Sequence, residues 1–150
     1  MLIALSRTFI SASLLAFAAL ILIPSFVAAQ SDSTLQKSGP IADEQNGIPY
    51  VTGGISDTEQ AVFADMRADY NLQLTMALDA GNYLSDIPVR VMDAQGNTVL
   101  EVTTAGPFLF AQLAPGNYTV EAMHNGNVQQ KAVEVGTNGA KDVIFTWSAG

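Results

Sequence analysis

The spacing of apolar residues changes twice along the chain. A nearly continuous apolar run from residue 9 to residue 23 comes first. Apolar residues then recur at helical spacing over 58–70, and at every second position over most of 71–147. Helical spacing is typical of a helix with one buried face, and alternation is typical of half-buried strands. The pattern therefore predicts an apolar leader, one short helix and a β-rich remainder.

The leader has the features of a removable export signal. Arg7 supplies a positive charge before the apolar run, Pro24 ends it, and Val27–Ala29 places small residues at a cleavage site. A transmembrane anchor is the alternative, but a run of roughly 15 residues is shorter than the roughly 20 that span a bilayer. We expect residues 1–29 to be removed, leaving a periplasmic or secreted protein with no stable membrane span.

Two segments precede the alternating region. Residues 30–47 are polar and aperiodic, which predicts a flexible spacer. Residues 48–70 predict a short extended segment followed by a helix, because Ser56 and Glu59 form a capping box. The polar face of this helix is acidic, which argues against a helix lying on a membrane surface. We expect it to cover an edge or end of the following sheet.

Residues 71–148 predict an all-β domain. Turns recur at roughly the 8–12-residue spacing that is typical of β-sandwiches. Asn125-Gly126 predicts a type I′ hairpin turn, and Pro88 predicts an edge strand or a bulge. The expected fold is a seven-stranded antiparallel sandwich with one short N-terminal helix. Its predicted strands cover residues 72–78, 83–91, 98–104, 108–113, 117–124, 127–135 and 141–147.

Composition excludes several classes of function. The 150 residues include 14 acidic and 6 basic side chains, with a net charge of −8. Such a chain repels phosphate backbones, so nucleic-acid binding is not expected. The absence of cysteine and the presence of one histidine exclude disulfide scaffolds, cysteine nucleophiles and nearly all zinc chemistry. No cofactor or metal is therefore assigned.

Candidate catalytic side chains are few. His124 is the one histidine, and it stands beside the predicted Asn125-Gly126 turn. Asp79, Asp86 and Asp93 are candidates for a carboxylate pair, but they lie near predicted strand ends, where acids are usually solvated turn residues. We assign no catalytic residue and expect no enzymatic activity.

Two segments resemble a known family. Residues 106–120 (GPFLFAQLAPGNYTV) resemble the G-x-F-x-F-x-x-L-x-P-G-x-Y-x-V signature of carboxypeptidase regulatory-like domains, whose fold is transthyretin-like (prealbumin-like). Residues 87–97 are similar to the strand and hairpin of the same family, V-x-V-x-V-x-D-x-x-G. The resemblance covers residues 71–147. The whole chain also resembles small exported proteobacterial proteins that carry this domain behind a short helix.

The resemblance implies packing rather than chemistry, because the signature residues have structural roles. It implies a tight turn at the proline and glycine, and a tyrosine whose hydroxyl bonds nearby backbone. The signature residues are Phe108, Phe110 and Leu113 at core or near-core positions, Pro115 and Gly116 in the turn, and Tyr118.

These observations favour an exported, non-catalytic β-sandwich module that mediates protein–protein interaction or has a structural role in the cell envelope. Its partner is then an unidentified envelope protein. The alternative is a carbohydrate-binding module for cell-wall or extracellular glycan, with Tyr50, Tyr83 and Trp147 as a stacking platform. Trp147 shares a predicted face with Phe145, which favours a place in the core. A row of exposed aromatic rings would distinguish the two functions.

Overall fold

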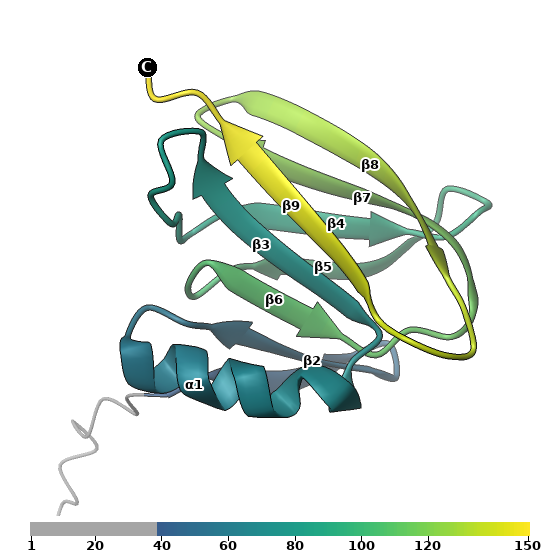
Figure 1. Cartoon of the computed structure of the whole chain (residues 1–150). Helices are drawn as coiled ribbons and strands as arrows, with labels where there is room; N and C mark the ends of the chain where they lie inside the picture. The colour runs from purple at the N-terminus through teal and green to yellow at the C-terminus, as the bar shows by residue number, and fades with distance from the viewer. Residues whose placement is uncertain (1–38) are drawn as a thin grey trace, which may run out of the picture. The chain divides into compact units, whose positions relative to one another are not determined.

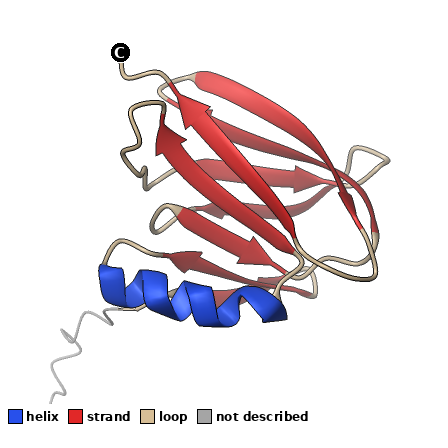
Figure 2. Ribbon diagram, in the orientation of Figure 1, coloured by secondary structure: helices blue, strands red, loops and turns tan. Residues whose placement is uncertain are grey.

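The structure, a computed structural model, describes residues 39–150 as an all-β sandwich with one short helix (Figures 1 and 2). The predicted export signal and the start of the predicted spacer lie outside these residues. One sheet has the order β1 (Ile41–Gln45), β2 (Ile48–Gly53), β6 (Phe108–Ala111), β3 (Leu72–Leu78), β9 (Lys141–Trp147). The other has the order β5 (Thr98–Thr103), β4 (Pro88–Met92), β7 (Gly116–His124), β8 (Asn127–Val135).

The sandwich has nine strands over the described residues, so the prediction of seven was wrong. The two additional strands form the β1–β2 hairpin. β1 takes residues 41–45 from the predicted spacer, and β2 pairs with β6 as part of the five-stranded sheet. Asn46 and Gly47 join the two strands with φ values of 54° and 76°, as a type I′ turn requires.

Strand pairing differs from the prediction in two further respects. β3 and β9 run parallel along their whole length, whereas an entirely antiparallel sandwich was predicted. Pro88 marks neither an edge strand, because β4 lies between β5 and β7, nor a bulge, because the register shift of β4 against β5 lies between Val91 and Met92. Proline is tolerated there as the first residue of the strand. The predicted Asn125-Gly126 turn is confirmed by φ values of 48° and 75°.

The main core lies between the two sheets. It is built by alternate residues of the strands other than β1, whose side chains point to the same face of the sheet. Val89 and Val91 of β4 and Leu74 and Met76 of β3 belong to this layer, and each of the four is at most 2% exposed. Trp147 belongs to the same core at 3% exposure.

Helix α1 (Asp57–Met66) covers the opposite face of the five-stranded sheet, and not an edge or end as the sequence predicts, because its Phe63 packs on residues of β2 and β6. Phe63, 1% exposed, packs its ring 5.3 Å from Phe108 and 4.8 Å from Phe110, edge-on to the latter. The two β6 phenylalanines therefore face the helix and not the space between the sheets, where Leu109 lies. Because β6 is buried on both faces, alternation alone does not assign either face.

The helix also buries residues of β3 that the alternating sequence pattern predicts to lie on the polar, exposed face of that strand. The chain continues from α1 through a 3₁₀ turn, η1 (Arg67–Asp69). The side-chain amide of Gln73 donates to the carbonyls of Arg67 and Tyr70, at 2.8 and 3.3 Å. A buried polar side chain is thus used to bond carbonyl groups at the end of the helical segment.

Polar side chains connect the two sheets along both sides of the sandwich, from the β1–β2 hairpin to β5 and from β8 to β9. The side chain of Gln45 bonds both the N–H and the carbonyl of Glu101 on β5, and Asn46 bonds the carbonyl of Val99. On the other side, Gln129 and Lys131 of β8 donate to backbone carbonyls of β9. Edge strands are templates for pairing with other chains, and these bonds occupy backbone groups of two of the four edge strands, β5 and β9.

We predict that Phe63→Ala lowers the free energy of unfolding by roughly 3–5 kcal/mol, because it leaves a cavity against two aromatic rings. Urea denaturation, followed by the fluorescence of the one tryptophan, measures the loss. Val62→Ala, on the same helix and only half-buried, is the control and should cost much less. Equal losses in the two variants would contradict the assigned role of Phe63.

Candidate functional site

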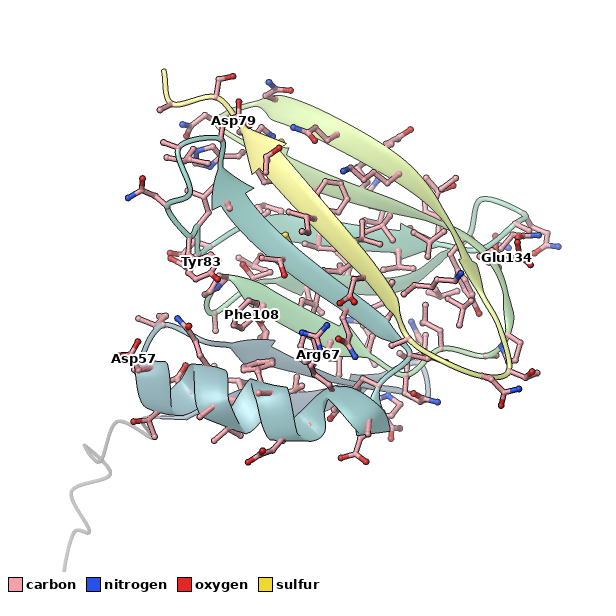
Figure 3. All side chains as sticks on the ribbon, in the orientation of Figure 1. Asp57, Arg67, Asp79, Tyr83, Phe108 and Glu134 are labelled. Atoms are coloured by element: carbon pink, nitrogen blue, oxygen red, sulfur yellow. The ribbon has the colours of Figure 1, made fainter. Side chains whose placement is uncertain are left out.

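Three loops meet at one end of the sandwich and expose apolar side chains there. They are the β2–α1, β3–β4 and β5–β6 connections, and they surround a hollow of about 180 Å³. Ile55 and Tyr83 are 69% and 53% exposed. Figure 3 shows Tyr83, Phe108 and Asp57 toward the end of the molecule where α1 begins. We call this surface the apolar end; its residues are Gly54, Ile55, Tyr83, Leu84, Ser85 and Pro107.

The loops of the apolar end are joined by close backbone contacts that require glycine. A Cβ atom on Gly106 would lie 2.3 Å from the carbonyl oxygen of Gly53, so the two loops touch backbone to backbone. A Cβ atom on Gly54 would lie 2.4 Å from the ring of Phe108, and the φ of Gly54 is 95°. The β2–α1 loop is therefore held against both β6 and the β5–β6 loop.

The N-terminus of α1 fixes the backbone at Ile55. The Glu59 carboxylate accepts hydrogen bonds from the N–H groups of Gly54 (2.7 Å) and Ile55 (3.1 Å). The Ser56 hydroxyl accepts from the Glu59 N–H at 3.2 Å, which confirms the predicted cap. The carboxylate reaches further back than a capping box requires, and so it anchors the loop that carries Ile55.

A buried threonine anchors the β5–β6 loop. Thr52, 3% exposed, donates its hydroxyl to the carbonyl of Phe108 (2.8 Å) and accepts from the N–H of Ala105 (3.0 Å). Both capacities of the hydroxyl are therefore used inside the structure.

Tyr83 is exposed, but its ring and its backbone contact the five-stranded sheet. Its ring lies 5.6 Å from that of Phe108 in an edge-on arrangement. Its backbone forms an isolated bridge with Ala77, and the N–H of Leu84 donates to the carbonyl of Met76 at 3.0 Å. The ring thus stands on the five-stranded sheet and not on a freely moving loop.

The three aromatic residues considered for a glycan platform do not form a row. Trp147 is buried, and its indole N–H donates to the carbonyl of Asn127 at 3.1 Å. Tyr50 is half-buried against the inter-sheet core, and its burial, followed by the charge of Asp43, raises the pKa of its hydroxyl. Among the aromatic side chains of residues 39–150, only Tyr83 is exposed.

The family-like motif residues have structural positions. Tyr118 donates its hydroxyl to the carbonyl of Ala114 at 2.7 Å, which is the contact that the sequence predicts. Leu113 lies in the inter-sheet core, and Asn71 bonds both its N–H and its carbonyl. Pro115 and Gly116 lead from there into β7.

The candidate carboxylates stand apart and bond their own surroundings. Asp79 accepts from Ser148, Asp86 accepts from Ser85, and Asp93 accepts from the N–H groups of its own hairpin loop. His124 is half-buried, with its ring 5.6 Å from Trp147. Within residues 39–150, no three His, Cys, Asp or Glu side chains are grouped to hold a metal ion. In that same range no helix combines the length and apolar character of a membrane span.

The apolar end lies among acidic residues. Asp57 follows Ile55 by two positions, and Asp86 follows Leu84 by two. The basic residues of the described range lie elsewhere: Arg67 pairs with Asp142 (2.6 Å) near the far end of α1, and Arg90 pairs with Glu121 (3.6 Å). Lys131 bonds β9 from β8, and Lys141 begins β9.

Comparisons with other proteins identify no family. No family model and no curated protein matches the chain. Among solved structures, the TIE protein of Bacillus anthracis is similar with a TM-score of 0.41 and 21% identity, over 51% of this chain. The matched part is 16% of the length of the TIE protein. The assignment of a β-sandwich rests on the strand pairing described above.

We predict that Gly106→Ala strongly destabilises the protein, because the new methyl group would overlap the backbone of Gly53 and neither loop has a flexible side chain to move. Thermal unfolding measures the effect. Gly116→Ala is the control, because the nearest atom to its added Cβ is 3.7 Å away, and its melting temperature should stay close to that of the wild type. A Gly106→Ala protein as stable as the control would refute the close contact.

The Asp93 loop predicts a specific pH dependence. The hydrogen bond from the Asn97 N–H, with those from Gln95 and Gly96, lowers the pKa of the Asp93 carboxyl below its ordinary value. The ionised carboxylate therefore stabilises the hairpin above the unfolded-state pKa, and this stabilisation is lost as pH falls through the folded-state pKa. Asp93→Asn should be less stable than the wild type at neutral pH in urea denaturation. The difference should shrink in acid; a constant difference would contradict the assignment.

Proposed function

We propose that this chain is an exported, non-catalytic β-sandwich module that binds another protein of the cell envelope through its apolar end. The observation that carries the proposal is the exposure of Ile55 and Tyr83 on a surface whose backbone is held by internal contacts. Exposed apolar surface is costly in water, and where it is held in one conformation it is typical of a docking site. Export rests on the sequence of residues 1–29.

The family assignment is part of the same proposal. A carboxypeptidase regulatory-like, transthyretin-like domain is supported by the Tyr118 hydroxyl bond and by the turn before β7. In this proposal the β1–β2 hairpin and α1 are additions to that domain. The connection between β2 and α1 supplies Gly54 and Ile55, two of the six residues of the apolar end.

Charge complementarity defines the partner that the apolar end would accept. The surface contributes an apolar centre, while Asp57 and Asp86 stand beside it and the basic residues lie elsewhere. A partner that buries an apolar side chain there gains most if lysine or arginine surrounds that side chain. We therefore propose a protein partner with an apolar residue inside a basic surface. Binding should weaken as the salt concentration rises.

The edges of β5 and β9 are a poorer site for such a partner. Side chains of β1, the β1–β2 turn and β8 already occupy backbone groups of β5 and β9. An incoming strand would have to displace these bonds before it paired. Docking on loops at the apolar end requires no such loss.

A photoreactive amino acid at position 55 tests the site in the cells that make the protein. We expect irradiation to give a discrete cross-linked protein at position 55. The control is position 128, because Val128 is also exposed and apolar (49%) but lies on β8, outside the apolar end. No adduct at position 55, or the same adducts at both positions, would contradict the proposal.

The captured protein must then bind the purified mature chain through the same surface. Ile55→Ser and Tyr83→Ser should each weaken binding by about tenfold or more, as loss of a central apolar contact does. Val128→Ser should leave the affinity unchanged. Asp86→Asn should weaken binding mainly at low salt, and Asn tolerates the φ of 57° at this position. Unchanged affinity in both apolar-end variants, with normal melting temperatures, would exclude this surface.

A further inference from the structure

Three Asn-Gly pairs occur in the described residues, at 46–47, 125–126 and 138–139. An asparagine before glycine is open to spontaneous deamidation, because glycine has no side chain to obstruct attack by its own backbone nitrogen. The reaction needs the asparagine side chain to rotate until its carbonyl carbon lies against the following nitrogen. Local structure that prevents this rotation therefore protects the residue, and the three pairs differ in such structure.

Two of the pairs are held in hairpins. Asn46 and Asn125 have φ values of 54° and 48° in two-residue turns, and each turn is closed by flanking strand pairs on both sides. Their side chains are also engaged: that of Asn46 donates to the carbonyl of Val99 at 3.0 Å, and that of Asn125 lies 3.2 Å from the His124 ring nitrogen. Rotation toward the glycine nitrogen would break these contacts.

The third pair lies in the β8–β9 loop, which crosses from one sheet to the other. Residues 136–140 are all exposed, and Asn138 is not in the left-handed region. The Asn138 side chain forms no hydrogen bond with another described residue, unlike those of Asn46 and Asn125. Neither ladder pairing nor a side-chain hydrogen bond holds this asparagine in place.

We propose that Asn138 is the principal deamidation site of this protein. The backbone nitrogen of Gly139 attacks Cγ of Asn138 and loses its proton to solvent. The Cγ–N bond of the side-chain amide breaks, and the nitrogen leaves as ammonia. Water then opens the succinimide at either carbonyl, giving aspartate or isoaspartate. No oxidant, reductant or enzyme is needed, and each event adds one negative charge to an already acidic chain.

The modification should leave the sandwich intact. Isoaspartate lengthens the backbone of the β8–β9 loop by one methylene. The change lies outside the strands, because β8 ends at Val135 and β9 begins at Lys141. The added carboxylate enters a loop in which Thr137 and Gly139 line a shallow hollow together with Arg67. We therefore expect modified and unmodified chains to share the same melting temperature and to separate by charge.

Incubation of the purified mature protein at mildly alkaline pH tests the proposal. Peptide mapping by mass spectrometry, with quantification of isoaspartate, follows all three pairs in one sample. We expect the Asn138 peptide to convert several-fold faster than the other two. The same protein incubated in concentrated urea should lose this ranking, because the hairpins no longer protect Asn46 and Asn125.

One variant and two comparisons of deamidation rates test the proposal further. The variant Asn138→Gln should remove the fastest-forming acidic species seen by charge-based separation of the folded protein. Conversion of Asn46 or Asn125 at the rate of Asn138 in the folded protein would overturn the proposal. An unchanged ranking in urea would overturn the claim that the hairpins protect Asn46 and Asn125. In the second case the rates would be set by local sequence and not by the fold.

Discussion

The contact between the backbones of Gly53 and Gly106 determines how the β1–β2 hairpin and helix α1 are placed on the sandwich. Because the two loops touch without side chains, β2 can end directly above the β5–β6 connection, and α1 can begin where Glu59 bonds the N–H groups of Gly54 and Ile55. From that start the helix lies along the outer face of the five-stranded sheet and places Phe63 on the two β6 rings. One close approach thus links the hairpin, the helix and the sandwich.

The same contact explains why the apolar end is suited to binding. Ile55 and Tyr83 project from loops whose backbones are bonded to the sheet or to the helix, so little conformational entropy remains to be lost when a partner docks. In the proposed complex, the acidic residues beside them would orient a basic partner during approach. The bonds of Gln45 and Lys131 limit pairing along the β5 and β9 edges.

The sequence predicts those parts of the fold in which local pattern and burial agree. β7 and β8 were predicted because apolar residues alternate on both sides of Asn125-Gly126. β1 was missed because Asp43 and Glu44 are exposed, and its stability comes from pairing with β2 and from the Gln45 bonds to β5, which are tertiary. The Asn46-Gly47 pair, which is typical of a hairpin turn, was the sequence signal that could have predicted β1. The side of the sheet that Phe108 and Phe110 face could not be predicted from the sequence, because it depends on where α1 packs. The apolar end brings together single residues from three loops, and no spacing in the sequence marks such a set.

Amide hydrogen exchange of the protein tests most directly whether the apolar end is preformed. The informative amides are those of Ile55, Leu84 and Ala105, which donate to Glu59, Met76 and Thr52. The amides of Thr137 and Gly139 in the exposed β8–β9 loop are the internal reference. We expect the first three to exchange far more slowly than the reference, at rates that approach those of the strands. Exchange of all three as fast as in the β8–β9 loop would contradict this expectation.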